Sequence, residues 1–317
     1  MENSDVNQQS EVFYKYRGAT RCLSVGISFL TDNFLAIVKL SLPYALTFAA
    51  ILTAIVYITS DSSFMDTMMR MSIDGNRTGI ILVVVLSLLY VLLFVAEVMY
   101  EGFIFRLVHI RSHNLPLSRF TPKAIWKSSL KYAGKAFWFY LVTVIIVQIC
   151  SMIAVLPFVF GGEGTIFEVL KIGVFAVVMS LTLIFALPLS VALPAMFLEK
   201  GKARRNAFYG YRKGLRIWGK VFCLSILIAI LQLFLIFVLS MPFVTMVSSY
   251  HAATQSQLYG DAVHLPGGFG VWYAICLFVT SYLYTFLLWL QTVPFAYLYA
   301  SIKSDEIEEA KNQYVNS

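Results

Sequence analysis

The sequence predicts an all-α, polytopic membrane protein with about six transmembrane helices, and three observations lead to this prediction. First, 59% of its 317 residues are hydrophobic and only 13% are charged, which is too little polar surface to cover a soluble domain of this size. Second, the apolar residues form long charge-free runs that lack the two-residue alternation of a membrane β-barrel. Third, two stretches of the chain, 85 residues apart, repeat each other in residue type.

Each apolar run is long enough to cross the hydrocarbon core of a bilayer, which needs about 20 helical residues. Residues 1–33 are polar and lack the pattern of a cleavable signal peptide, so we expect the first span to act as the insertion signal. We expect a cytoplasmic segment over 1–33, a transmembrane domain over 34–302 and an acidic cytoplasmic tail over 303–317. The six spans are expected at about 34–59, 79–100, 136–160, 172–198, 221–247 and 271–300.

Basic residues are distributed unevenly between the two sides of the membrane. Twenty of the 24 lysines and arginines fall in the two termini and in the loops after spans two and four. The opposite loops, 61–77, 163–170 and 248–270, carry only Arg70 and Arg77. The positive-inside rule therefore predicts that both termini are cytoplasmic. The net charge of +7 is explained by this asymmetry, and because no nucleic-acid-binding motif accompanies it we expect no nucleic-acid partner.

The repeated stretches are residues 126–137 and 211–222, each basic and aromatic. Each is followed by an apolar run with a central glutamine, Gln148 or Gln232, and then by Pro-Phe-Val. This pattern predicts an internal repeat in which a basic amphipathic helix precedes a pair of spans. A third copy without the basic residues is expected around Asn33, before the first span.

The two blocks are expected to form helices over 121–135 and 206–220 that lie along the cytoplasmic leaflet. In the first block, Trp126, Leu130, Ala133 and Phe137 form an apolar stripe beside lysines spaced four residues apart. Rings would be buried in the membrane while the cationic tips reach anionic phospholipid headgroups. Plain interfacial anchoring and docking of an acidic partner are the alternatives. The candidate headgroup-binding residues are Lys123, Lys127, Lys131, Lys135, Arg212, Arg216 and Lys220.

Two charged residues are predicted inside the membrane, where ionisable groups are functional candidates. Lys39 in span one and Glu97 in span two are expected at similar depths, where an ion pair would relieve the desolvation of both. Separate snorkelling to the interface, or a proton or ion relay, are the alternatives. Glu101, one helical turn beyond Glu97, is expected to reach water.

Amides and prolines also interrupt the spans. Gln148, Gln232 and Gln291 are expected to form hydrogen bonds between helices, or else to line a path for a polar substrate. Prolines kink helices and free backbone carbonyls. The pair Pro188 and Pro194 predicts a kink in span four.

No residue pattern supports catalysis, a metal or a cofactor. His109 and His113 are four residues apart, but they are expected in a cationic loop without a third ligand. The methionines at positions 65, 68, 69 and 71 could attract Cu(I), but they are explained more simply as the cap of a span. There is no phosphate-binding glycine loop or nucleophile elbow. The four single cysteines are expected to be inert, buried thiols.

A resemblance to a known group of proteins rests on the stretch from Phe29 to Phe34 and on the paired spans and basic connectors that follow it. The chain resembles uncharacterised bacterial six-span integral membrane proteins, which are similar to the membrane domain of some glycerophosphodiester phosphodiesterases. The resemblance covers about residues 20–300 and implies the six-span fold. The catalytic barrel of those enzymes has no counterpart here, so neither their activity nor any functional residue carries over.

Three functional classes are compatible with these observations. The one favoured is a non-enzymatic envelope protein of the bacterial inner membrane that organises anionic lipid of the cytoplasmic leaflet, or a membrane partner, through its basic helices. A small-solute or lipid transporter or channel is the alternative, because repeats are common in transporters. An intramembrane lipid-modifying enzyme is the third class. A protein partner or a homo-oligomer remains open.

Overall fold

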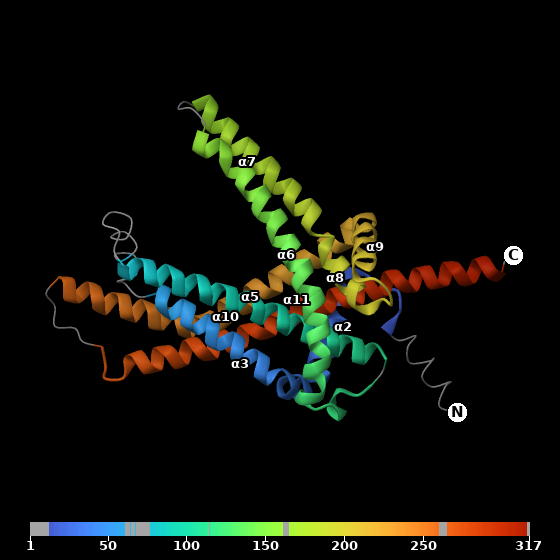
Figure 1. Cartoon of the computed structure of the whole chain (residues 1–317), viewed down its shortest axis with the longest axis horizontal. Coiled ribbons are helices and arrows are strands. Elements are labelled where there is room, and N and C mark those ends of the chain that lie inside the picture. Colours follow the sequence, from blue (N-terminus) through green and yellow to red (C-terminus); the bar gives the residue numbers. More distant parts are fainter. Residues whose placement is uncertain are drawn as a thin grey trace. The chain divides into compact units, whose positions relative to one another are not determined.

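The computed structural model describes residues 13–60, 64, 67, 77–113, 115–160, 165–259 and 265–315. These residues form helices and no strand, and six helices are long and apolar enough to cross a membrane (Figure 1), which confirms the predicted fold class. The methionines at 65, 68, 69 and 71 lie outside the described residues. The elements are α2 (Ala19–Asp32), α3 (Phe34–Thr59), α5 (Arg77–Ser112), η1 (Leu117–Arg119), α6 (Pro122–Phe160), α7 (Thr165–Ala186), α8 (Leu189–Leu198), α9 (Ala203–Arg216), α10 (Trp218–Leu258) and α11 (Phe269–Val315).

Several helices are longer than the predicted spans. Helix α3 has the expected bounds, whereas α5, α6, α10 and α11 contain 36, 39, 41 and 47 residues. At 1.5 Å per residue these four helices measure about 54–70 Å. Since the hydrocarbon core is about 30 Å thick, parts of each must extend out of it. His109 and His113, expected in a loop, lie instead at the end of α5 and just after it.

The fourth span is broken, as the proline pair predicts. Helix α7 ends at Ala186 and α8 begins at Leu189, with Leu187 and Pro188 forming a turn between them. Proline has no backbone N–H and its ring displaces the carbonyl four residues before it, which interrupts a helix. The other prolines within spans, Pro43, Pro157, Pro194, Pro242 and Pro294, lie inside helices that continue past them.

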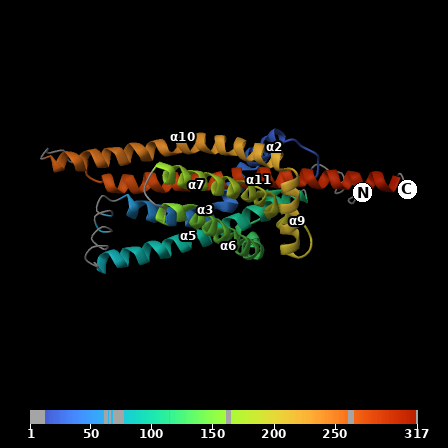
Figure 2. The same ribbon diagram turned by 90° about the horizontal axis from the view of Figure 1, so that it is seen from above.

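The chain divides into two compact units, and each is described separately. The first contains residues 1–37, 101–228 and 290–317, and the second contains 38–100 and 229–289. In the second unit, segments of α3, α5, α10 and α11 run alongside one another (Figures 1 and 2). The Trp289 indole donates to the Tyr100 hydroxyl at 2.7 Å, and the Ser60 and Tyr273 hydroxyls are 2.6 Å apart.

The core of the first unit is built from the end of α5, the start of α6, helix α8 and the second half of α11. Every side chain from Val191 to Leu198 is buried. Phe105 stacks on Phe197 with ring centres 4.5 Å apart. Most of α6 beyond residue 140 and of α7 is exposed in the described residues, although the two helices are antiparallel neighbours. Apolar side chains exposed in this way suit a lipid environment.

The two repeated blocks do not fold alike. Helix α9 ends at Arg216, a single residue, Ile217, interrupts the helix, and α10 follows. Helix α2 meets α3 in the same way through Asn33. The block expected as a separate helix over 121–135 is instead continuous with its span in α6. That expectation was wrong because shared residue types do not determine whether the backbone breaks: Tyr132 continues its helix where the aligned Ile217 ends one.

Candidate functional site

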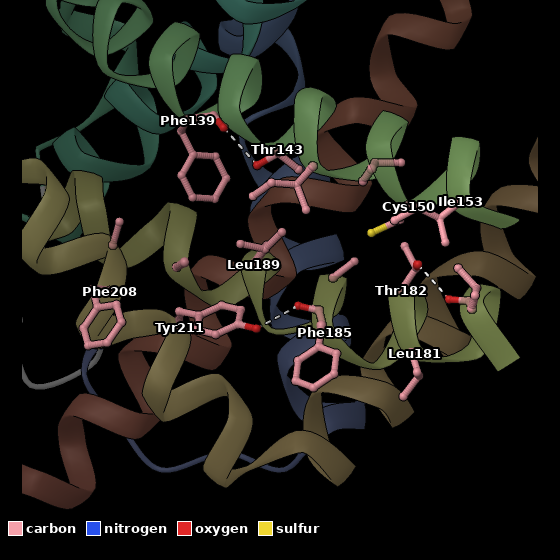
Figure 3. Close-up of a pocket in the computed structure, with 16 residues that line it drawn as sticks. Phe139, Thr143, Cys150, Ile153, Leu181, Thr182, Phe185, Leu189, Phe208 and Tyr211 are labelled. Carbon is pink, nitrogen blue, oxygen red and sulfur yellow. Dashed lines mark hydrogen bonds between the residues drawn. The ribbon is translucent and has the colours of Figure 1, made fainter. Parts of the chain in front are cut away.

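Four helices of the first unit, α6 to α9, line an apolar groove of about 590 Å³ (Figure 3). Helix α6 contributes Phe139 and Thr143, α7 contributes Phe185, and α9 contributes Phe208 and Tyr211. The turn of Leu187 and Pro188 separates α7 from α8 within this lining. Tyr211 of α9 points toward Phe185 at the end of α7 (Figure 3).

The hydroxyl groups that line the groove donate hydrogen bonds to backbone carbonyls of the same helices that form it. Thr143 and Thr182 donate to carbonyls one turn earlier in their helices, at 2.9 and 2.8 Å. The Tyr211 hydroxyl donates to the carbonyl of Phe185 at 3.2 Å (dashed lines in Figure 3). These three donors are therefore not free to bind a polar solute. The lining suits an alkyl chain, which needs dispersion contacts and no hydrogen bonds.

Helix α9 packs on α8 through glycine. A Cβ atom at Gly210 would lie 2.9 Å from the Cα of Ala192, and one at Gly214 would lie 3.1 Å from the Cα of Pro188. Small residues four apart let two helix backbones approach this closely. The spacing is visible in the sequence, and it is a packing motif that our sequence analysis missed.

The opposite face of α9 is apolar and basic. Phe208 is 69% exposed, and Leu215 is also exposed. Arg204 and Arg212 are exposed and lie one helical turn on either side of Phe208. Because Phe208 lines the groove, these two guanidinium groups are placed on the face of α9 that borders it. Arg216, one of the predicted headgroup-binding residues, is exposed as well.

The start of α6 has a similar division of faces. Ile125, Ser129, Ala133 and Ala136 are buried, so Ala133 belongs to the packed face and not to the expected apolar stripe. On the other side Trp126 and Leu130 are each 45% exposed. The three lysines Lys123, Lys127 and Lys131 are exposed beside them.

The two remaining lysine candidates are held by tyrosines. The Lys135 ammonium lies 6.0 Å from the centre of the Tyr132 ring. The Lys220 ammonium lies 4.6 Å from the centre of the Tyr16 ring and donates to the Tyr16 hydroxyl at 3.1 Å. Cation–π contacts of this kind fix the position of the charge.

The expected ion pair between Lys39 and Glu97 is not formed among the described residues. Lys39 is exposed, whereas Glu97 is half-buried. The buried face of α3 includes Leu40 and Tyr44, and helical geometry places Lys39 on the side away from that face. Similar depth along two helices was therefore not enough to bring the two side chains together.

The three span glutamines do not line any of the described cavities. Gln232 donates to the backbone carbonyl of Leu287 at 3.0 Å, which is the expected bond between helices. Gln148 and Gln291 are exposed.

Glu101, which was expected to reach water, is buried and only 7% exposed. The Thr292 hydroxyl of α11 donates to it at 3.5 Å. The expectation was wrong because it assumed that α5 becomes exposed to water as soon as it extends past the predicted end of the span. Instead α5 continues into the core of the first unit, and residues 103–105 are also buried there.

The acidic tail is helical and docks on α9. Glu306 pairs with Lys213 and accepts a hydrogen bond from Tyr209, while Glu199 pairs with Lys303 at 3.2 Å. Burial and the contact with Glu306 raise the pKa of Tyr209, which remains a neutral donor. These contacts join the tail to α9 and to Glu199, which directly follows α8, and only the structure reveals which acid meets which base.

The fold and the site define a polytopic helical membrane protein with six apolar helices. No family model, curated protein or solved structure matches the chain. Among the described residues no three His, Cys, Asp or Glu side chains are grouped so that they could hold a metal ion.

Proposed function

We propose that this protein is a non-enzymatic component of the bacterial inner membrane that binds and organises anionic phospholipid of the cytoplasmic leaflet. The groove between α6 and α9 takes an acyl chain, and the arginines that flank Phe208 attract the headgroup. The observation that carries the proposal is an apolar groove with two exposed arginines on either side of its Phe208. The hydroxyl groups of the groove already donate to backbone carbonyls. The proposal includes cytoplasmic termini, as the positive-inside bias predicts.

The faces of α9 and of the start of α6 support this proposal. Both helices expose apolar side chains beside basic ones, the arrangement of amphipathic interfacial helices. Each lysine or arginine near an anionic surface contributes about 1 kcal/mol of attraction. An internal repeat that presents two such faces on one side of the membrane would gather anionic lipid at both.

Arg204→Gln/Arg212→Gln is expected to reduce the amount of phosphatidylglycerol that the purified protein retains by several-fold, because two headgroup cations are lost. Native mass spectrometry at low ionic strength measures the retained lipid. Lys200→Gln/Lys202→Gln is the matched control, since it removes two exposed charges from the loop before α9. Equal losses in the two variants would contradict a headgroup site on this face of α9.

The lysine stripe of α6 gives a separate prediction. Lys123→Gln/Lys127→Gln/Lys131→Gln is expected to weaken retention of anionic lipid while leaving membrane insertion intact. The difference from wild type should shrink in high salt, because exposed charges are screened over about 8–10 Å. The same retention by both proteins at low salt would show that this stripe only anchors the helix.

A further inference from the structure

A second cluster of cations lies where α5 meets the start of α6, and none of its residues lines the groove. The Nε of Arg106 donates to the Ser128 hydroxyl at 3.1 Å, and its Cζ lies 5.7 Å from the centre of the Tyr132 ring. The Lys135 ammonium is 6.0 Å from the centre of the same ring. Two cations from two helices are therefore held on one aromatic side chain.

His109 adds an unsatisfied nitrogen to this cluster. Its ring centre is 6.1 Å from that of Tyr132 and 4.8 Å from that of His113, which it meets edge to face. The Nδ1 atom of His109 is buried and has no hydrogen-bond partner among the described residues. Because buried polar atoms are nearly always hydrogen-bonded, this nitrogen indicates a ligand or water at the cluster.

The cluster is held in place by stacked aromatic rings and a close helix contact. Tyr132 stacks on Phe197 with ring centres 5.5 Å apart, and Phe197 stacks in turn on the buried Phe105. Helices α5 and α6 are in close backbone contact here, since a Cβ atom at Gly102 would lie 2.8 Å from the Cα of Ala133. Gly102 is one turn before Arg106, so the contact fixes the distance between the basic side chains of the two helices.

Among the residues that the structure describes, no carboxylate forms an ion pair with these two cations. The ion pairs of the described residues use Glu168, Glu199 and Glu306, and none of them reaches Arg106 or Lys135. Both cations are half-buried. A partly desolvated cation without a counter-charge is unfavourable, and an anion bound between the two helices would offset that cost.

The depth of the cluster identifies the anion. Arg106 lies six residues past the predicted end of span two at 100, which is about 9 Å along a helix, and Lys135 directly precedes the predicted span from 136. This is the level of the headgroup layer. Arginine binds phosphate through two parallel hydrogen bonds, and lysine binds it as a point charge.

We propose that Arg106, His109 and Lys135 form a phosphate-binding site around Tyr132. The ligand is a phosphate group, carried either by a lipid headgroup or by a free phosphate. Arg106 and Lys135 supply the charge, and the Nδ1–H of a neutral His109 ring donates the third hydrogen bond. Burial and the nearby His113, Arg106 and Lys135 lower the pKa of His109 to about 4, so its imidazole is neutral.

The test uses the full-length protein in nonionic detergent with two probes, inorganic phosphate and dioleoyl phosphatidic acid. Calorimetry measures the affinity for phosphate, and native mass spectrometry measures phosphatidic acid adducts. Arg106→Gln is expected to weaken binding at least tenfold for whichever probe the wild type binds. Arg119→Gln, which removes an exposed charge just before the start of α6, should stay within twofold of wild type. Binding of phosphatidic acid alone identifies a lipid ligand, and binding of both probes a site that accepts free phosphate.

Arg106→Gln also removes the bond to Ser128 and could unfold the region, so Lys135→Gln is measured in parallel because it leaves that bond in place. Lys135→Gln is expected to weaken binding about tenfold with an unchanged melting temperature. Arg204→Gln/Arg212→Gln should leave the phosphate affinity unchanged, which separates this site from the groove. The proposal is overturned if the wild type binds neither probe, or if Lys135→Gln binds as tightly as Arg119→Gln.

Discussion

Gly210→Ala is expected to destabilise the protein by about 1–3 kcal/mol, the cost of overpacking a close helix contact. The added methyl would lie 2.9 Å from the Cα of Ala192 and 3.0 Å from the carbonyl oxygen of Val191, both backbone atoms. Neither can move as a side-chain end could, so α9 must shift away from α8. The melting temperature in detergent, followed by tryptophan fluorescence, measures the loss.

Gly134→Ala is the matched control for this change. Gly134 lies inside α6, and a Cβ atom there would meet nothing within 4 Å. Alanine favours a helix over glycine by about 0.5–1 kcal/mol, so this variant should be slightly more stable than wild type. If both alanine variants move the melting temperature in the same direction, the close packing of α9 on α8 is wrong.

A displaced α9 also bears on the lipid proposal. Phe208 and Tyr211 line the groove, and the glycine face holds α9 against α8. Gly210→Ala should therefore reduce retained phosphatidylglycerol without the loss of any charge. Retention equal to wild type in a destabilised variant would mean that lipid binds the arginines alone.

Much of the fold could be predicted from the sequence because a bilayer imposes a simple rule on it. Charge-free runs must become helices, and this was sufficient for the six spans. The break at Pro188 was also predictable, since it follows from the chemistry of one residue. The expected bond of Gln232 between helices is confirmed, since an amide within a span has few other partners.

What could not be predicted depends on the rotation and the neighbours of each helix. Lys39 and Glu97 were expected at similar depths, but the side of α3 that carries Lys39 is exposed. Glu101 was expected to reach water because the hydropathy of α5 does not reveal that the helix continues into a packed core. The cluster around Tyr132 was also missed, because it needs α5, α6 and α8 to meet, and no local pattern specifies that meeting.

The orientation of the protein in the membrane can be tested by labelling in intact cells, because each introduced cysteine is reached by the reagent on one side only. Twenty basic residues on one side against two in the opposite loops predict that both termini are cytoplasmic. Cysteines introduced at Ser63 and Ser256 should react fully with an impermeant maleimide in intact cells, whereas cysteines at Lys202 and Asn312 should not. Lys202 and Asn312 suit the test because both are exposed.

The native cysteines determine the background labelling in this experiment. Cys150, Cys223 and Cys276 are at least partly accessible and must be replaced by serine, which corrects the expectation that all four thiols are buried. Cys22 can remain, because it is fully buried and burial raises its pKa to about 11, so little reactive thiolate exists at neutral pH. Labelling at Lys202 and Asn312 in intact cells, with none at Ser256, would invert the topology. It would also place the basic faces of α6 and α9 on the outer leaflet, where the attraction to anionic lipid of the cytoplasmic leaflet could not operate.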